Sequence, residues 1–143
     1  MNKSKLNIEM INSRISLIKD NLNKLHELEN LTKEDFFKDY RNYNTAENLL
    51  RQSLEAIFDI GRHILAKING LSVDFEYKII AKKLIEKEII TSSLQESLIN
   101  MAGYRNRLIH FYHDILVDEI YDILHKHLND IEKFVKEIII FIS

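Results

Sequence analysis

The chain has 143 residues, of which 45% are hydrophobic and 29% are charged, proportions typical of a soluble globular domain. It contains no cysteine, which excludes disulfide bonds and thiolate catalysis. Twenty lysines and arginines against 22 acidic residues give a net charge of −2, so any contact with nucleic acid must be local. The sequence shows neither a signal-peptide pattern nor the roughly 20 apolar residues of a membrane span. We therefore expect one cytoplasmic domain over residues 1–143.

Apolar residues recur at helical spacing along most of the chain, and no alternating strand pattern is present. A first helix is expected over residues 6–28, where one stripe advances by four and three positions: Ile11, Ile15, Ile18, Leu22 and Leu25. Residues 32–35 resemble the capping signature of a short helix. A second long helix is expected over residues 42–68, and Gly70 would end it as a left-handed cap.

Gly61 lies on the apolar face of the second long helix, where glycine costs roughly 1 kcal/mol of helix propensity against alanine. Close approach of a neighbouring helix would explain why a glycine is used there. A third helix is expected over residues 75–87. Its inward positions would be Ile79, Ile80, Ala81, Leu84 and Ile85.

The next helix is expected to begin at a cap formed by residues 91–93 and to continue past Gly103 to about Tyr112 or His113. A last helix would begin near Asp118 and carry one long apolar stripe: Ile120, Leu124, Leu128, Ile131, Val135, Ile138 and Ile142. No linker divides the pattern. The sequence therefore predicts an all-α fold, an up-and-down bundle of about five helices in a single domain.

The segment 105–112 reads Arg-Asn-Arg-Leu-Ile-His-Phe-Tyr and concentrates the polar chemistry of the chain. Arginine stays charged and presents a planar fork to phosphate oxygens, and histidine transfers protons near neutral pH. Asn106, His110 and His113 share one stripe of an ideal helix. Arg105 and His110 are about 140° apart at 100° per residue. Arginine reach, or a kink near the preceding glycine, must bring these two side chains together.

Metal-independent RNA cleavage is the reaction that these residue types suit best. His110 would move the proton of a ribose 2′-hydroxyl, and Arg105 would stabilise the charge that develops on phosphorus. Asn106 would orient the imidazole or donate to phosphate, and His113 is a candidate substrate contact. One histidine rarely serves as both acid and base, so a dimer with two motifs would complete the site. An arginine and a histidine five positions apart also occur by chance, which leaves a packing role open.

The pattern R-x4-H-x-Y at Arg105, His110 and Tyr112 resembles the motif of HepT-like toxins, a branch of the HEPN superfamily. The resemblance extends over residues 6–142 and is clearest in three further segments: residues 50–61, 101–106 and 118–121. It implies an all-α homodimer whose two motifs meet in a shared cleft. It also implies a ribonuclease toxin that cleaves cellular RNA, either mRNA or tRNA, with Arg105 and His110 as the catalytic pair.

The same resemblance implies a partner, an MntA-like nucleotidyltransferase antitoxin that adds AMP to Tyr112. A nucleotide there would add bulk and negative charge beside His110, which would block and repel a phosphate substrate. Arg107 occupies a variable position of the motif and adds a cation that would help to hold RNA. Residues 87–88 stand where many relatives have a glycine turn.

Neither a metal nor another cofactor is expected. His125 and His127 diverge by about 200° on a helix and make a poor metal pair. His26 and His63 stand alone in helical patterns and are interpreted as surface or packing residues. Two other functions stay open. The chain could be a non-enzymatic subunit that docks a nucleotidyltransferase, or a purely structural helical dimer.

Overall fold

The computed structural model describes residues 3–70, 76–109 and 117–143. These ranges contain seven α-helices, two 3-10 turns (η1, Lys3–Lys5; η2, Ser92–Leu94) and no β-strand. The α-helices are α1 (Ile8–Glu29), α2 (Lys33–Lys38), α3 (Tyr40–Asn69), α4 (Tyr77–Glu86), α5 (Gln95–Ile109), α6 (Val117–Lys126) and α7 (Leu128–Ile142). The predicted all-α bundle is confirmed. The helix count exceeds five because α2 is a separate short helix and the last predicted helix is divided in two.

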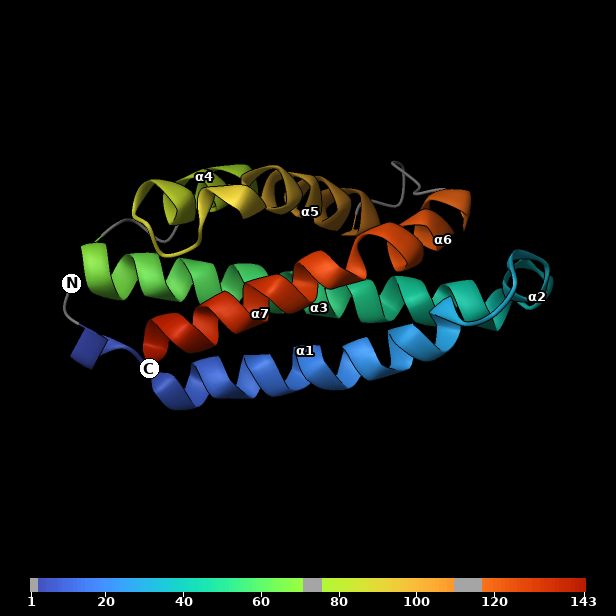
Figure 1. Ribbon diagram of the computed structural model, residues 1–143, viewed down its shortest axis with the longest axis horizontal. Coiled ribbons are helices and arrows are strands. Elements are labelled where there is room, and N and C mark those ends of the chain that lie inside the picture. Colours follow the sequence, from blue (N-terminus) through green and yellow to red (C-terminus); the bar gives the residue numbers. More distant parts are fainter. Residues whose placement is uncertain (1–2, 71–75, 110–116) are drawn as a thin grey trace.

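The long helix α3 is the centre of the bundle (Figure 1). It packs against α1 on one side and against α4 and α5 on the other, and it also contacts α2 and α6. Helix α7 follows α6 and packs against α1. None of the described helices is long and apolar enough to cross a membrane.

The predicted apolar stripes form the core. All five stripe residues of α1 are buried, and so are most of those in α3, α6 and α7. Ile79 is the exception: it was expected to face inward, but its side chain is 39% exposed. Helix α4 packs through Ile80, Ala81 and Leu84. Because each residue turns the helix by about 100°, Ile79 lies about 100° from Ile80 and about 140° from Leu84, outside this face, and it is partly exposed.

Helices α3 and α4 approach closely at Gly61, as predicted. A Cβ atom added there would lie 2.9 Å from Leu84 Cδ1 and 3.0 Å from Ile80 Cγ2. One turn of α3 earlier, the ring of Phe58 stacks on the ring of Tyr77, with centroids 4.8 Å apart and planes 20° apart. The glycine thus allows α4 to lie against α3 with Tyr77 fixed on a buried aromatic ring.

Two of the predicted helix caps are confirmed. The Thr32 hydroxyl accepts a hydrogen bond from the Asp35 amide at 3.1 Å and begins α2. Gly70 ends α3 with φ of 62°, in the left-handed region that glycine enters without steric cost.

The predicted cap at residues 91–93 is wrong in its details. A 3-10 turn, η2, comes first, and α5 begins only at Gln95. The Thr91 side chain caps neither element. Instead its hydroxyl donates to Glu137 Oε2 at 3.0 Å and its amide donates to Glu137 Oε1 at 2.7 Å. Thr91 therefore fastens the connection before α5 to α7, a partner that local sequence does not reveal.

The single last helix that the sequence predicts is divided at His127. Helix α6 ends at Lys126 and α7 begins at Leu128. The apolar stripe passes through the break without interruption, because Leu124 and Leu128 are both buried. The side chain of His127 turns to Asp130, with Nδ1 3.4 Å from Oδ2. The break in the helix leaves the spacing of the apolar residues unchanged, so the apolar pattern of the sequence could not reveal it.

His26, which was expected to be a surface or packing residue, joins α1 to α7. Its Nδ1 lies 2.8 Å from Glu29 Oε1 and its Nε2 lies 2.6 Å from Glu132 Oε1. The hydrogen bonds to Glu29 and Glu132 raise the pKa of His26 above its ordinary value of 6.5. Both ring nitrogens donate, so the charged imidazolium is the form that the fold favours.

The stabilising effect of His26 should be larger in acid than in alkali. Because the folded pKa is raised, the stabilisation is complete below the unfolded pKa and is lost as pH rises through the folded pKa. We expect the free energy of unfolding to differ more between wild type and His26→Gln at about pH 5.5 than at about pH 8.5. Urea unfolding of both proteins at both pH values measures this difference. An equal difference at the two pH values would contradict the assignment.

Glu88 adopts a backbone conformation normally reserved for glycine, with φ of 59°. Its amide donates to the Ile85 carbonyl at 3.0 Å, and the Ile89 amide donates to the Leu84 carbonyl at 3.0 Å. These two bonds form a Schellman cap at the end of α4. The turn at residues 87–88 therefore has the backbone shape of a glycine cap, with a glutamate in the left-handed position.

Glu88→Gly should stabilise the protein by about 1 kcal/mol, because it removes the steric cost of a left-handed non-glycine residue. The melting temperature should rise by roughly 3 °C for a domain of this size. Glu86→Gly, inside the last turn of α4, is the matched control and should cost about 1 kcal/mol. Thermal unfolding followed by circular dichroism compares the three proteins. A destabilised Glu88→Gly variant would be inconsistent with this cap.

Candidate functional site

The structure describes three of the six predicted site residues: Arg105, Asn106 and Arg107. The others, His110, Tyr112 and His113, lie outside the described residues, as does the predicted helical continuation to Tyr112 or His113. Helix α5 runs through Gly103 without interruption and places the three described residues in its last turns.

Arg105 lies on the face of an aromatic ring. Its guanidinium carbon is 4.0 Å from the centroid of Tyr77, which α4 holds against Phe58. Cation–π contacts of this kind contribute about 0.5–2 kcal/mol, depending on how far the cation is desolvated. The contact fixes the position of a long side chain without neutralising its charge.

The charge of Arg105 has no carboxylate partner among the described residues. Its side-chain hydrogen bond is a long one, 3.5 Å from Nη1 to Asn106 Oδ1. Its Nε is buried and has no hydrogen-bond partner in the described part of the chain. A guanidinium carries five N–H donors, so most of those on Arg105 remain available to an anion.

Arg62 is a second cation beside the same ring, and sequence reasoning missed it. Its guanidinium carbon lies 5.4 Å from the Tyr77 centroid, and its buried Nε also has no partner within the described ranges. Arg62 comes from α3, Tyr77 from α4 and Arg105 from α5. No local pattern links these three positions, since the packing of three helices brings them together.

Arg107, in contrast, is neutralised. Its guanidinium donates to both carboxylate oxygens of Glu119, with Nη1 2.8 Å from Oε1 and a close second bond from Nη2 to Oε2. It also lies over the ring of Tyr104 at 5.4 Å. The prediction that Arg107 contacts RNA is untested, but the structure gives this cation another role, which is to join α5 to the first turn of α6.

The ion pair between Arg107 and Glu119 should contribute modestly to stability. The two side chains are 41% and 29% exposed, so solvent screens much of their attraction. A double-mutant cycle with Arg107→Gln and Glu119→Gln should give a coupling energy of about 0.2–1 kcal/mol that decreases in high salt. Urea unfolding of the four proteins measures it. Strictly additive effects would show that the pair is not formed in solution.

His125 and His127, the described histidines of this region, turn to different aromatic partners. His127 Nε2 lies 3.4 Å from the Tyr104 hydroxyl, and the ring of His125 packs on Tyr121 with centroids 4.1 Å apart. Burial, and secondarily Glu119, raises the pKa of Tyr104. Throughout the described ranges, no three metal-ligating side chains lie together.

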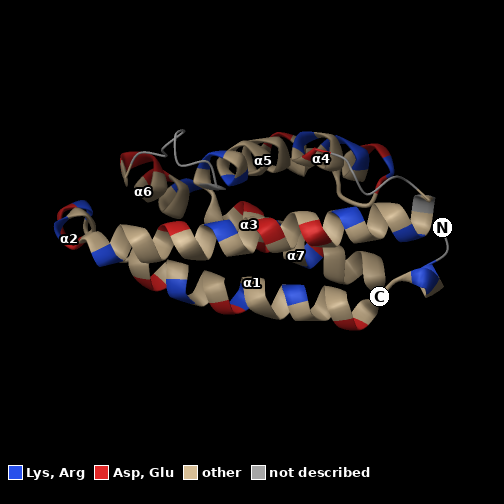
Figure 2. Cartoon of the chain, turned by 180° about the vertical axis from the view of Figure 1, so that it is seen from behind, with Lys and Arg blue, Asp and Glu red and all other residues tan. Residues whose placement is uncertain are grey.

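Basic and acidic residues alternate along α1 and α3, so neither helix carries a long single-sign face (Figure 2). Cationic character is instead local, as the net charge of −2 requires. The Arg62, Tyr77 and Arg105 cluster is one such place. It offers two guanidinium groups around one ring to an anionic ligand.

Known proteins resemble this chain over most of its length. Residues 18–138 match the model of a family described as Ribonuclease HepT-like. A protein of Aphanizomenon flos-aquae named tRNA nuclease HepT is 32% identical over 136 residues, which cover 92% of this chain and 90% of that protein. A protein of Shewanella oneidensis named mRNA nuclease HepT is 29% identical over 86 residues, covering 60% of this chain and 64% of that protein.

Solved structures share the fold. A crystal structure of a toxin–antitoxin with AMP-PNP superposes with a TM-score of 0.82 at 23% identity, covering 92% of this chain and 98% of the matched chain. The tri-AMPylated HEPN toxin of Shewanella oneidensis, in complex with an MNT antitoxin, also gives 0.82 at 24% identity, covering 98% and 99% of the two chains. At these identities the structures establish the HEPN-type helical fold.

Proposed function

This chain belongs to the HepT-like ribonuclease family, and on that premise we propose that it is the RNA-cleaving toxin of a toxin–antitoxin pair. The observation that carries the proposal is the guanidinium of Arg105, fixed on the Tyr77 ring with its charge unpaired among the described residues. It lies in the same R-x4-H-x-Y motif as His110. The nuclease names of the two HepT relatives support RNA as the substrate, and we place its action in the cytoplasm, where cellular RNA is available.

The reaction needs no metal. His110 accepts the proton of a ribose 2′-hydroxyl, whose oxygen attacks the adjacent phosphorus. The bond from phosphorus to the 5′-oxygen breaks, which leaves a 2′,3′-cyclic phosphate and a 5′-hydroxyl. Arg105 stabilises the extra negative charge on the phosphoryl oxygens during the attack. Asn106 accepts from Arg105 and can hold the guanidinium toward phosphate, and His113 is a further substrate contact.

A second acid completes the reaction, because the leaving 5′-oxygen must take up a proton. We assign this role to a second copy of the motif, brought to a composite cleft by a homodimer. Two separate groups are needed because one imidazole cannot be deprotonated as the base and protonated as the acid at the same moment.

Purified protein should cleave RNA in the presence of EDTA, and Arg105→Ala or His110→Ala should each lower the rate by about 10²- to 10⁴-fold. The loss follows from removing the charge or the proton-transfer group that acts only in the transition state. Gel analysis of a labelled RNA, with identification of the 2′,3′-cyclic phosphate, measures the reaction. Arg41→Ala is the control, because Arg41 is an exposed arginine paired with Asp39 at the start of α3. Cleavage that survives both motif substitutions would reject the site.

Regulation by a nucleotidyltransferase antitoxin is the second part of the proposal. The Shewanella oneidensis HEPN toxin is AMPylated in its complex with an MNT antitoxin, and we propose that Tyr112 receives AMP in this chain. Tyr112 is next but one to His110 in sequence. An AMP group there places a negative phosphate beside residues that bind phosphate, so modification excludes RNA by volume and by charge.

Co-expression with the cognate nucleotidyltransferase should add the mass of one or more AMP groups to the protein. Intact-mass spectrometry should show that Tyr112→Phe removes the modification. Tyr104→Phe is the matched control and should retain it, because the Tyr104 hydroxyl is half-buried against His127. An adduct that persists in Tyr112→Phe would move the modification to another residue.

One alternative is a non-enzymatic subunit that docks a nucleotidyltransferase. The net charge of −2 favours it, since general affinity for RNA is absent. Expression in cells separates the two functions. A toxin arrests growth and His110→Ala relieves the arrest, whereas a docking subunit has no such His110-dependent effect.

A further inference from the structure

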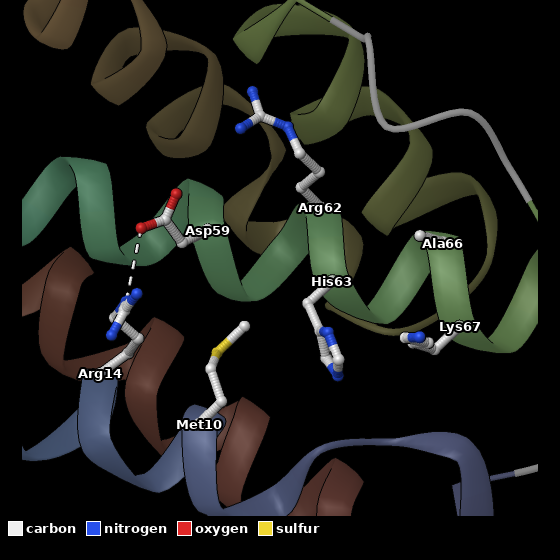
Figure 3. A pocket seen from close by; sticks show the side chains of 7 residues that line it. All are labelled: Met10, Arg14, Asp59, Arg62, His63, Ala66 and Lys67. Atoms are coloured by element: carbon white, nitrogen blue, oxygen red, sulfur yellow. Dashed lines mark hydrogen bonds and ion pairs between the residues drawn. The ribbon is translucent and has the colours of Figure 1, made fainter.

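A solvent-open groove lies between α1 and α3, some distance in sequence from the motif (Figure 3). Its volume is about 430 Å³. The polar side chains that line it are Arg14 from α1 and Asp59, Arg62, His63 and Lys67 from α3. We name this feature the α1–α3 groove.

The groove is cationic in a chain that carries a net negative charge. Three cationic side chains, Arg14, Arg62 and Lys67, line the groove against a single carboxylate, Asp59. The Arg14–Asp59 pair is a single contact of 3.4 Å between side chains that are each 39% exposed, so it holds Arg14 only weakly. Lys67 is exposed and forms no ion pair with the described residues. The groove therefore keeps a positive surplus after its internal pair is formed.

The walls of the groove are fixed before any ligand binds. His63 Nε2 accepts a hydrogen bond from the Asn7 amide at 2.9 Å, which ties the start of α1 to α3. Burial, and then Lys67, lowers the pKa of His63, so the ring is neutral near pH 7 and its proton is on Nδ1. His63 thus offers a hydrogen-bond donor to the groove without adding charge.

Arg62 connects the groove to the motif. Figure 3 shows its side chain projecting from α3 toward α4 and α5, away from His63. Its guanidinium carbon lies 5.4 Å from the Tyr77 centroid, on the ring that also carries Arg105 at 4.0 Å. Arg62 thus belongs both to the lining of the groove and to the cluster around Tyr77, which contains the arginine that the proposed reaction uses.

We propose that the α1–α3 groove binds the phosphodiester backbone of single-stranded RNA beside the nucleotide that is cleaved. Arg14 and Lys67 contact phosphates in the groove, and Arg62 holds the chain between the groove and Arg105. This inference rests on the proposed ribonuclease function. RNA is the occupant that the arrangement favours, because Arg62 links this cationic groove to the ring that carries Arg105, and an arginine fork matches phosphate oxygens. The groove would hold substrate in place without contributing to bond cleavage.

The test compares RNA affinity in a His110→Ala background, which prevents cleavage. Fluorescence anisotropy with a labelled single-stranded RNA of about 20 nucleotides is measured over a range of salt concentrations. Lys67→Gln should weaken binding by roughly 3- to 10-fold, and its plot of log affinity against log salt should be shallower by about 0.7. The double variant Arg14→Gln, Lys67→Gln loses two phosphate contacts, so its slope should be shallower by about 1.4.

Lys136→Gln is the matched control, because Lys136 is an exposed lysine on α7. It should bind RNA as the parent does. Melting curves of all variants show that they are folded.

Each outcome decides one point. A double variant that binds RNA like the control overturns the groove, and the ribonuclease proposal stands if the wild type still cleaves RNA. A wild type that neither binds nor cleaves RNA overturns both. A double variant that keeps its RNA affinity but no longer associates with the nucleotidyltransferase assigns the groove to a protein partner and overturns the RNA assignment.

Discussion

The contact between the Arg105 guanidinium and the Tyr77 ring is the interaction on which the proposed site depends. A free arginine side chain carries about 2 kcal/mol of rotamer entropy, which a substrate would otherwise have to overcome. The ring removes part of that freedom and leaves the positive charge available. Arg107, two positions along the same helix, shows the opposite arrangement, because Glu119 both fixes and neutralises it. Neighbouring arginines of one motif thus differ: the proposed substrate contact, Arg105, keeps its charge, and Arg107 is neutralised in helix packing.

The position of the ring is itself a result of helix packing. Gly61 lets α4 approach α3 at van der Waals distance, and the ring of Phe58, from α3, stacks on the ring of Tyr77, from α4. Arg105, to which we assign the phosphate contact, is therefore held by a ring that α3 and α4 position, although it lies in α5. The same packing brings Arg62 to the ring. The geometry of the proposed site is thus coupled to core packing through Tyr77.

Sequence periodicity predicted the helices and most of the core. Buried residues recur once per helical turn, and this spacing is visible within a short stretch of sequence. Periodicity failed at His127, where a break keeps the apolar spacing, and at Ile79, which lies outside the buried face of α4. The motif pointed to Arg105 as a candidate, since its chemistry is concentrated in one segment. Tyr77 and Arg62 could not be found in the same way, because a ring and a guanidinium from two other helices meet Arg105 only after the bundle has formed.

The most direct measurement is the RNA affinity of Tyr77→Leu, made in the His110→Ala background with and without Arg105→Ala. If the ring acts by holding the guanidinium, Tyr77→Leu weakens binding several-fold when Arg105 is present. When Arg105 has been removed, Tyr77→Leu weakens RNA binding much less. The remaining loss of affinity comes from the contact between Tyr77 and Arg62. An equal effect in both backgrounds, or none in either, would contradict the role of this contact.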